Sequence, residues 1–381
     1  MTFEFATAGR IIFGNGTLAQ AAPAAAGLGR RALVVTGRNT DRARTLLDAL
    51  QKENVGAELF TVGGEPTVAE VLKAVERARS AQCDLVIGFG GGSVIDLAKA
   101  AAALMTNPGD PFDYLEVIGK GLPLRERPAP CIAIPTTAGT GAEVTKNSVL
   151  ASPEHRVKVS IRHPLMMPAL AIIDPECTLS MPPAVTAATG LDALTQLLES
   201  FISKKANSMT DGFCREGLPR AVHSLRRAFE NGADLKARED MALASLFSGL
   251  ALANAGLGAV HGFSGPIGGM FNVPHGMVCA ALLPHVMKVN LTALKARQPD
   301  SPALAKLAEF AKMTGGATAE DGIKWIAGLC RDLQVQPLSA LGVSGKDFPA
   351  LVGNAQRASS MKTNSVELTK RELTQILHVA L

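Results

Sequence analysis

Five short segments rich in valine, isoleucine, leucine and other apolar residues occur in the first half of the chain and constrain its fold most strongly. They occupy residues 31–36, 57–62, 84–89, 131–135 and 169–174. Apolar runs without polar alternation are typical of parallel strands that are covered on both faces. Segments with helical periodicity, at 40–53 and 68–81, separate the first three runs. The pattern predicts an open parallel sheet flanked by helices.

The texture of the chain changes after Pro182 and Pro183. From residue 186 onward the sequence is rich in alanine and leucine, has helical periodicity and contains no convincing strand. A length of 381 residues is enough for two hydrophobic cores. We therefore expect an α/β domain over residues 1–181 and an all-helical domain over residues 182–381.

Charge and cysteine content exclude several classes of protein. The net charge is only +4, and basic residues form no cluster larger than two or three, so nucleic-acid binding is not indicated. The six cysteines form no CxxC pair, and the N-terminus carries no secretory signal. A cytoplasmic protein with reduced thiols and a small-molecule partner is expected.

One apolar segment resembles a membrane span in length. Residues 241–260 contain no charge, but they include two serines, an asparagine and several glycines, and no basic cluster flanks them. A buried helix of the helical domain explains this composition better, and we expect no membrane partner.

A glycine-rich turn follows the third predicted strand. In DLVIGFGGGSVIDLAKA, beginning at residue 84, a helix is expected to start at about Ser93. The backbone N–H groups of Gly90, Gly91, Gly92 and Ser93 could approach a phosphate at that helix N-terminus. The stretch PTTAGTGAE, from Pro135, offers a second such loop. Tight turns remain the alternative reading of any single glycine, and the GxGxxG fingerprint is absent.

Four polar residues in the second half have the chemistry of a metal site. Asp192 and Gln196 are four residues apart, which places them on one helix face. His261 and His275 lie among glycines further along. Together they could bind a divalent ion such as Fe²⁺ or Zn²⁺. The alternative is that the histidines cap helices and Asp192 pairs with a backbone group.

Several motifs in order along the chain resemble those of the iron-containing (group III) alcohol dehydrogenases, in the dehydroquinate synthase-like superfamily. The matching blocks are GRIIFGNG at 9–16, GGGSVID at 90–96, PTTAGTGAEVT at 135–145, GLDAL at 190–194 and the histidine-bearing stretch from Val260. Two positions depart from the family pattern. Gln196 stands where the family usually has a histidine ligand, and Gly265 replaces the second histidine of an H-x3-H pair.

The resemblance implies roles for particular residues. It suggests metal binding by Asp192, Gln196, His261 and His275, and catalysis by His261, His275 and Lys158. Its cofactor-binding positions are Gly37, Arg38, Gly90, Gly91, Gly92, Ser93, Asp96, Thr136, Thr137, Thr140 and Lys158. His285 is expected to lie outside the ligand set. The resemblance also suggests a homodimer that binds NAD or NADP and Fe²⁺ or Zn²⁺, with metal occupancy left open by Gln196.

The residues after the first strand bear on the choice of nucleotide. Relatives often carry a carboxylate there that binds the adenosine ribose, but this chain has Gly37, followed by Arg38, Asn39 and Arg42. Loss of an anion and gain of guanidinium groups favour acceptance of the 2′-phosphate of NADP, without excluding NAD.

Three functions are compatible with the sequence. The first is an NAD(P)-dependent oxidoreductase that interconverts an alcohol and an aldehyde or ketone, with a divalent metal polarising the substrate oxygen. The second is a metal-free reductase of the same fold, like the maleylacetate reductases, in which Arg162 or Lys158 binds the carboxylate of an oxo acid. The third is a nucleotide-binding protein without catalytic activity.

Overall fold

The computed structural model describes residues 2–155, 157–271 and 273–381, which form two compact units. The α/β unit comprises Ala6–Thr137 and Gly141–Ser180. The helical unit comprises Met181–Leu381, joined by the N-terminal residues up to Phe5 and by Ala138–Thr140. Two short stretches of the first half thus belong to the helical unit.

A six-stranded parallel sheet forms the centre of the α/β unit. Its strands are β1 (Ile11–Phe13), β2 (Arg31–Gly37), β3 (Gly56–Val62), β4 (Leu85–Gly90), β5 (Cys131–Pro135) and β8 (Leu170–Ile173). Their order across the sheet is β1-β8-β5-β4-β2-β3. The predicted α/β class and all five predicted strands are confirmed. The three-residue edge strand β1 was not predicted, because it is too short to give a pattern.

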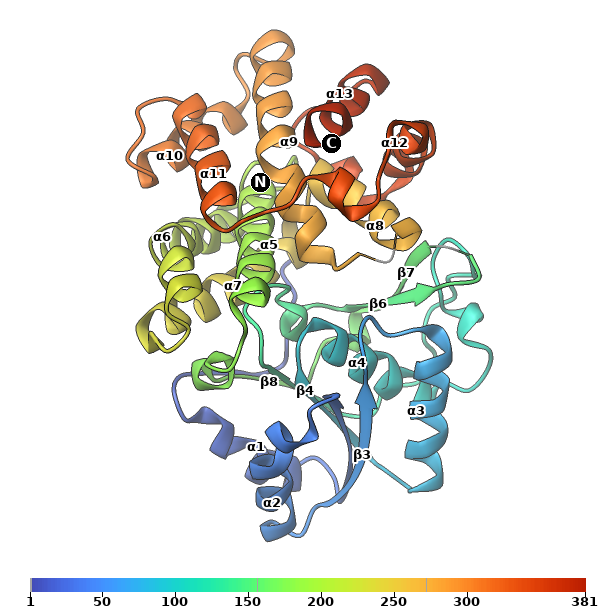
Figure 1. Ribbon diagram of the computed structural model, residues 1–381. Coiled ribbons are helices and arrows are strands. Elements are labelled where there is room, and N and C mark those ends of the chain that lie inside the picture. Colours follow the sequence, from blue (N-terminus) through green and yellow to red (C-terminus); the bar gives the residue numbers. More distant parts are fainter. Residues whose placement is uncertain (1, 156, 272) are drawn as a thin grey trace. The chain divides into compact units, whose positions relative to one another are not determined.

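Helices cover both faces of this sheet. Leu33 and Val35 face a core that includes α3 (Val68–Ser80) and α4 (Gly92–Thr106), whereas Val34 lies in a separate core with α1 (Ala21–Ala26) and α2 (Arg44–Lys52). Figure 1 shows these two helix pairs beside the blue and teal strands. Burial on both sides explains why the inner strands β2, β4, β5 and β8 are mostly apolar. The helix expected at 40–53 begins as a short 3₁₀ turn, Thr40–Ala43, before α2.

The buried Lys99 of α4 holds the loop that follows β5. Its Nζ donates to the carbonyl oxygen of Ala142 at 2.9 Å and to Oγ1 of Thr145 at 3.0 Å, and also to the carbonyl oxygen of Asn147. It pairs with Oδ1 of Asp96 at 3.0 Å. A buried ammonium requires such partners, so the loop and the helix are fixed together.

A second, two-stranded sheet was not predicted. It is an antiparallel hairpin of β6 (Asn147–Ser152) and β7 (Val157–Arg162). Both strands alternate between buried and more exposed residues, so neither gives the continuous apolar run that marks the central strands.

The helical unit contains the second half of the fold, as expected. Its helices are α5 (Pro183–Phe201), α6 (Ser208–Glu230), α7 (Leu235–Ala255), α8 (Ala259–Phe271), α9 (His275–Arg297), α10 (Pro302–Met313), α11 (Ala319–Asp332), α12 (Phe348–Arg357) and α13 (Lys370–Ala380). They share one large core of alanine, leucine, valine and phenylalanine side chains.

The charge-free segment 241–260 is not a single helix. It covers most of α7 and then breaks at Gly256, whose φ is 70°, so that α7 and α8 meet at a bend of 99°. Within the described part of the chain, α9 is the single helix long and apolar enough to cross a membrane, and 72% of its apolar window is buried inside the protein. Such burial is typical of a core helix.

The two early stretches that join the helical unit make specific contacts there. The ring of Phe5 lies 5.6 Å from that of Phe213 on α6. Ser248 Oγ lies 3.4 Å from the carbonyl oxygen of Gly139. A Cβ on Gly139 would lie 2.8 Å from the backbone oxygen of Thr189, so this close approach requires glycine.

The buried carboxyl of Glu143, 2% exposed, makes the stability of the protein depend on pH. Burial raises its pKa from 4.5 to about 7. Because the folded pKa is the higher one, its contribution to stability is complete below about pH 4.5 and is lost as the pH rises towards 7. Glu143→Gln should therefore raise the free energy of unfolding by about 2–4 kcal/mol at pH 8, with little gain at pH 4.

Urea unfolding of wild type and variant across this pH range measures the effect. The matched control is Glu53→Gln, which changes an exposed side chain and should leave the pH profile as it is. Parallel profiles for wild type and Glu143→Gln would contradict the assignment.

Candidate functional site

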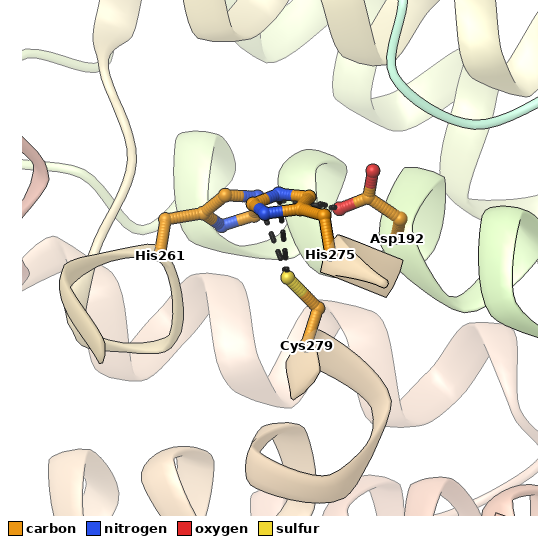
Figure 2. A group of neighbouring side chains, drawn as sticks. All are labelled: Asp192, His261, His275 and Cys279. Carbon is orange, nitrogen blue, oxygen red and sulfur yellow. Dashed lines mark hydrogen bonds and ion pairs between the residues drawn. The ribbon is translucent and has the colours of Figure 1, made fainter. Parts of the chain in front are cut away.

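Three helices of the helical unit, α5, α8 and α9, bring a cluster of possible metal-ligand atoms together. Helix α5 carries Asp192, His261 lies in the first turn of α8, and His275 is the first residue of α9, with Cys279 one turn later. Their side chains converge, as Figure 2 shows. One ligand atom from each of the four residues lies within 4.8 Å of all the others.

The geometry of Asp192 fits a divalent cation. Its Oδ1 lies 3.3 Å from Nε2 of His261 and 3.7 Å from Nε2 of His275. Although this oxygen is buried, no described residue donates a well-aligned hydrogen bond to it, which is costly for a carboxylate. In a regular tetrahedron with metal bonds of about 2.0–2.1 Å, neighbouring donors are about 3.4 Å apart. The residues present therefore fit a metal ion.

Exposure is uneven around the cluster. The side chains of Asp192 and His261 are 2% and 6% exposed, whereas that of His275 is 34% exposed. A metal site that acts on substrate must leave one position accessible, and the His275 side of the cluster provides it.

Gln196, the predicted fourth ligand, is hydrogen-bonded at both ends of its amide. Its Nε2 donates to Oδ2 of Asp192 at 3.1 Å, and its Oε1 accepts from Ser248 Oγ at 2.8 Å. The assignment of amide nitrogen and oxygen follows from these partners, because the reverse orientation would place an oxygen against the carboxylate. Its role as a ligand stays a prediction.

The buried Glu199 orients His261. Its Oε2 lies 2.7 Å from Nδ1 of the imidazole, and its Oε1 accepts from the backbone nitrogen of Val260 at 2.7 Å. A hydrogen bond at Nδ1 fixes the tautomer and directs Nε2 towards the cluster. Glu199 is one helix turn from Gln196 on α5, so a single helix supplies carboxylate, amide and the support for His261.

The four clustered groups shift one another's pKa. Burial raises the pKa of the Asp192 carboxyl, but His275 and His261 outweigh it and hold that pKa below its usual value. For the Cys279 thiol burial likewise raises the pKa, and the same two imidazoles turn the balance downward. Burial lowers the pKa of His261, yet Cys279 and Asp192 bring it well above its usual value. The protonation of each group therefore depends on the charges of the others.

The α/β unit contains a separate pocket at the carboxyl ends of β2, β4 and β5. Its lining includes Gly37 at the end of β2, Arg42 in the 3₁₀ turn that follows, Gly91 directly after β4, and Thr136 and Thr137 directly after β5. The chain runs from β2 to the edge strand β3 and returns to β4 on the other side of β2. Such a change of direction is where open α/β sheets bind ligands.

The N-terminus of α4 opens into this pocket. Its N-cap is Gly91, and no side chain caps the helix. A Cβ on Gly90 would lie 2.5 Å from a methyl group of Val94, so the turn is closed to larger residues. The first backbone N–H groups of α4, from Gly92 and Ser93, have no partner within the helix and suit a phosphate.

Three other predicted cofactor residues, Arg38, Asp96 and Thr140, lie outside the lining of this pocket. Arg38 packs over the end of β3, where a Cβ on Gly63 would lie 2.6 Å from its Nε. Asp96 accepts from the backbone nitrogen of Val149 at 3.1 Å in addition to its pairing with Lys99. Thr140 belongs to the helical unit. None of these three side chains lines the pocket at β2, β4 and β5.

Two basic residues of β7 are paired with carboxylates. The side chain of Lys158 is 5% exposed, and its Nζ lies 2.5 Å from Oε2 of Glu65. Nε of Arg162 lies 3.4 Å from Oε1 of Glu116. The catalytic role of Lys158 and the alternative carboxylate-binding role of either residue stay predictions.

Two further positions were singled out by the histidine motif: His285 and Gly265. His285 lies two to three turns beyond His275 on α9, and burial together with Lys288 lowers its pKa. At Gly265 on α8, a Cβ would meet nothing within 4 Å. The position where relatives carry a histidine is therefore open.

The sequence reasoning missed Cys279, Glu199 and Ser248. Cys279 lies four residues after His275, the spacing that places two side chains on one helix face, so it could have been found from the sequence. Glu199 likewise lies seven residues after Asp192 on the same face. Ser248 comes from α7 and gave no signal, since its contact with Gln196 depends on how the helices pack.

Comparisons with known proteins agree along the whole chain. Residues 8–175 match the family model described as iron-containing alcohol dehydrogenase, and residues 186–381 match that of the C-terminal part of the Fe-containing alcohol dehydrogenase family. Alcohol dehydrogenase 4 of Schizosaccharomyces pombe is 35% identical over 382 residues, covering 97% of this chain and 87% of the relative.

Two solved structures are similar over their full length. That of a 1,3-propanediol oxidoreductase is 32% identical with a TM-score of 0.92, and the match covers 100% of both chains. Sulfoacetaldehyde reductase from Bifidobacterium kashiwanohense, in complex with NAD⁺, is 29% identical with a TM-score of 0.88, covering 100% of this chain and 98% of the other.

Replacing Glu199 tests whether it orients the imidazole. Glu199→Gln keeps the shape of the side chain but leaves one oxygen to serve both the backbone N–H of Val260 and the ring of His261. We expect divalent-metal affinity to fall about 10–100-fold, as is typical when a hydrogen bond that orients a ligand is lost. Equilibrium dialysis over a range of metal concentrations measures this affinity. The control is Glu216→Gln, on the surface of α6. Equal affinity in Glu199→Gln and wild type would count against this role.

Proposed function

The chain belongs to the iron-containing alcohol dehydrogenase family, and from that premise we propose that its helical unit holds a divalent metal and its α/β unit holds the nicotinamide nucleotide. The enzyme interconverts an alcohol and an aldehyde or ketone by hydride transfer. An alcohol and NAD(P)⁺ give a carbonyl compound, NAD(P)H and one proton. The observation that carries the proposal is the convergence of Asp192, His261 and His275 around a buried carboxylate oxygen to which no described residue donates a well-aligned hydrogen bond.

Asp192, His261 and His275 are the proposed metal-binding residues. A bound divalent ion supplies Lewis acidity, which polarises the substrate oxygen and stabilises its negative charge as hydride leaves or arrives. The chain's own groups prepare the site: Glu199 holds the His261 ring, and Gln196 holds Asp192. The exposed side of His275 admits the substrate oxygen. Lys158 remains a proposed participant on the resemblance alone.

The pocket at the carboxyl ends of β2, β4 and β5 is the proposed nucleotide site. The N–H groups at the start of α4 would bind the pyrophosphate, and the hydroxyl groups of Thr136 and Thr137 line the same pocket. A solved relative binds NAD⁺, and we propose NAD or NADP here. Gly37 and Arg42 line the pocket and favour acceptance of a 2′-phosphate.

Substrate class and cellular setting are further parts of the proposal. The named relatives act on small molecules, including 1,3-propanediol and sulfoacetaldehyde, and a small primary alcohol or its aldehyde is proposed here. All six cysteines are free thiols, which supports a reducing compartment such as the cytoplasm. A homodimer, and a functional division into nucleotide-binding residues 1–181 and metal-binding residues 182–381, complete the proposal.

Removing the metal should abolish turnover. We expect chelation to reduce kcat below about 1% of its starting value and Fe²⁺ or Zn²⁺ to restore it, because several kcal/mol of transition-state stabilisation depend on the ion. His261→Ala and His275→Ala should lower kcat more than they raise KM for the alcohol. His223→Ala, an exposed residue of α6, is the matched control.

Activity after chelation also distinguishes the metal-dependent enzyme from a metal-free reductase and from a non-catalytic protein. Full activity after chelation, together with turnover of an oxo acid, would favour a metal-free reductase. Nucleotide binding with no turnover of any alcohol, aldehyde, ketone or oxo acid would favour a non-catalytic protein.

Substitution at Gly37 tests the nucleotide site. A Cβ there meets nothing within 4 Å, so Gly37→Asp fits without displacing other atoms. The new carboxylate would repel a 2′-phosphate and accept from free ribose hydroxyls, which should shift preference towards NAD by about 1–2 kcal/mol, or about 5–30-fold. Arg42→Ala should weaken NADP selectively.

The measured quantity is the ratio of kcat/KM for NADPH and NADH in each variant. Arg44→Ala is the matched control, because that guanidinium pairs with Asp41 at the surface and lies outside the pocket lining. If the ratio is unchanged in Gly37→Asp, the adenosine ribose lies elsewhere.

A further inference from the structure

We propose that the thiolate of Cys279 is the fourth protein ligand of the metal, that Gln196 positions Asp192 without binding the ion, and that the site accordingly prefers zinc to iron. This inference rests on the proposed function, since it specifies the donor set of the same metal site. It concerns a residue of this chain that the sequence motifs do not single out.

The position of Cys279 is that of a ligand. Helix α9 places it one turn after His275, and the two side chains point to the same side of the helix (Figure 2). Its Sγ lies 3.6 Å from Nε2 of His275 and 3.8 Å from Nε2 of His261. With bond lengths of about 2.3 Å to sulfur and about 2.0–2.1 Å to nitrogen, a regular tetrahedron separates these atoms by about 3.6 Å. The observed distances are close to that value.

The four donor atoms surround a common point. Oδ1 of Asp192 completes the set at 3.3 Å and 3.7 Å from the same two nitrogens. Each pair of these four atoms is separated by no more than 4.8 Å. Asp192, His261 and Cys279 are buried, so a thiol, a carboxylate and one imidazole lie out of water, with the partly exposed imidazole of His275 at their edge.

Gln196 is oriented for a different task. A ligand amide must direct its oxygen at the metal, but the end of Gln196 that faces Asp192 is the nitrogen, which donates to Oδ2 at 3.1 Å. Its oxygen accepts from Ser248 on α7. Gln196 therefore holds the carboxylate of Asp192 through Oδ2, and Oδ1 faces the two imidazoles. Turning the amide over would place its oxygen against the carboxylate oxygen of Asp192, with no hydrogen between them.

The donor set decides the metal. Thiolate is a soft ligand that selects zinc among the divalent ions a cell supplies, whereas carboxylate and amide oxygens are harder donors. Two imidazoles, one carboxylate and one thiolate form a set that suits tetrahedral zinc. With four protein ligands, zinc would have to expand to five-coordination to accept a substrate oxygen, and the more exposed His275 side is where that oxygen would enter.

Cobalt substitution provides a readout that does not depend on activity. The full chain, kept reduced, is stripped of metal with a chelator and loaded with one equivalent of Co²⁺. A thiolate ligand gives an intense near-ultraviolet charge-transfer band, which oxygen and nitrogen ligands do not give. We expect the band in wild type, in Gln196→Leu and in Cys330→Ser, and its loss in Cys279→Ser and Cys279→Ala. Cys330 is the matched control because it is also buried, with its Sγ facing the carbonyl oxygen of Ala280.

Zinc affinity gives a second measure. Competition with a chromophoric chelator should show zinc binding weakened by more than about tenfold in Cys279→Ala, and wild type should bind Zn²⁺ more tightly than Fe²⁺. Wild-type protein that holds cobalt without the band, or Cys279→Ser that keeps it, overturns the assignment of Cys279. Loss of the band in Gln196→Leu, with its fold intact, overturns the role given to Gln196.

These outcomes are separable from a failure of the proposed function. A metal-dependent enzyme without the charge-transfer band leaves the function standing and removes Cys279 from the ligand set. A protein that binds no divalent ion and stays fully active after chelation overturns both.

Discussion

The carboxylate of Glu199 joins α5 to α8 at the place where the donor atoms meet. It accepts hydrogen bonds from the backbone nitrogen of Val260 and lies against the His261 ring, while Oδ1 of Asn364 accepts from the nitrogen of Ala259 at 3.0 Å. The first N–H groups of a helix have no partner inside it. One buried carboxylate thus helps to start α8 and also orients an imidazole, so the backbone and the site cannot be altered independently.

This dual use explains the tight packing around the turn before α8. A Cβ on Gly258 would lie 2.7 Å from Oε1 of Glu199 and from Oδ1 of Asn364. Asn364 in turn exchanges hydrogen bonds with Asn290 on α9. The network extends from the helix that carries Asp192 to the helix that carries His275. Rigid support of this kind is what holds donor atoms at the spacing a metal ion requires.

The fold was predictable where burial is uniform and was not where burial alternates. Strands β2, β4, β5 and β8 are largely apolar on both faces, so their residues alone identify them, whereas the edge strand β3 carries Glu58 and is only half-buried over most of its length. The β6–β7 hairpin has one protected face and was missed. The break at Gly256 was missed as well, because composition does not distinguish one long buried helix from two that meet at a sharp bend. The motifs led to Asp192, His261 and His275, but contacts made through packing, such as Ser248 with Gln196 and Lys158 with Glu65, leave no pattern in the sequence.

The order of synthesis matters for a unit assembled from distant stretches. Phe5 leaves the ribosome long before Phe213, the aromatic residue it packs against, and Gly139 likewise precedes Thr189 and Ser248. The strands of the α/β unit can pair during translation. The residues up to Phe5 and Ala138–Thr140 can reach their final contacts only after the helices of the second half have been synthesised. A fragment that begins at Met181 would lack these two pieces. The helical unit is therefore not one continuous segment, and gene fusion or recombination at a single position could not transfer it whole.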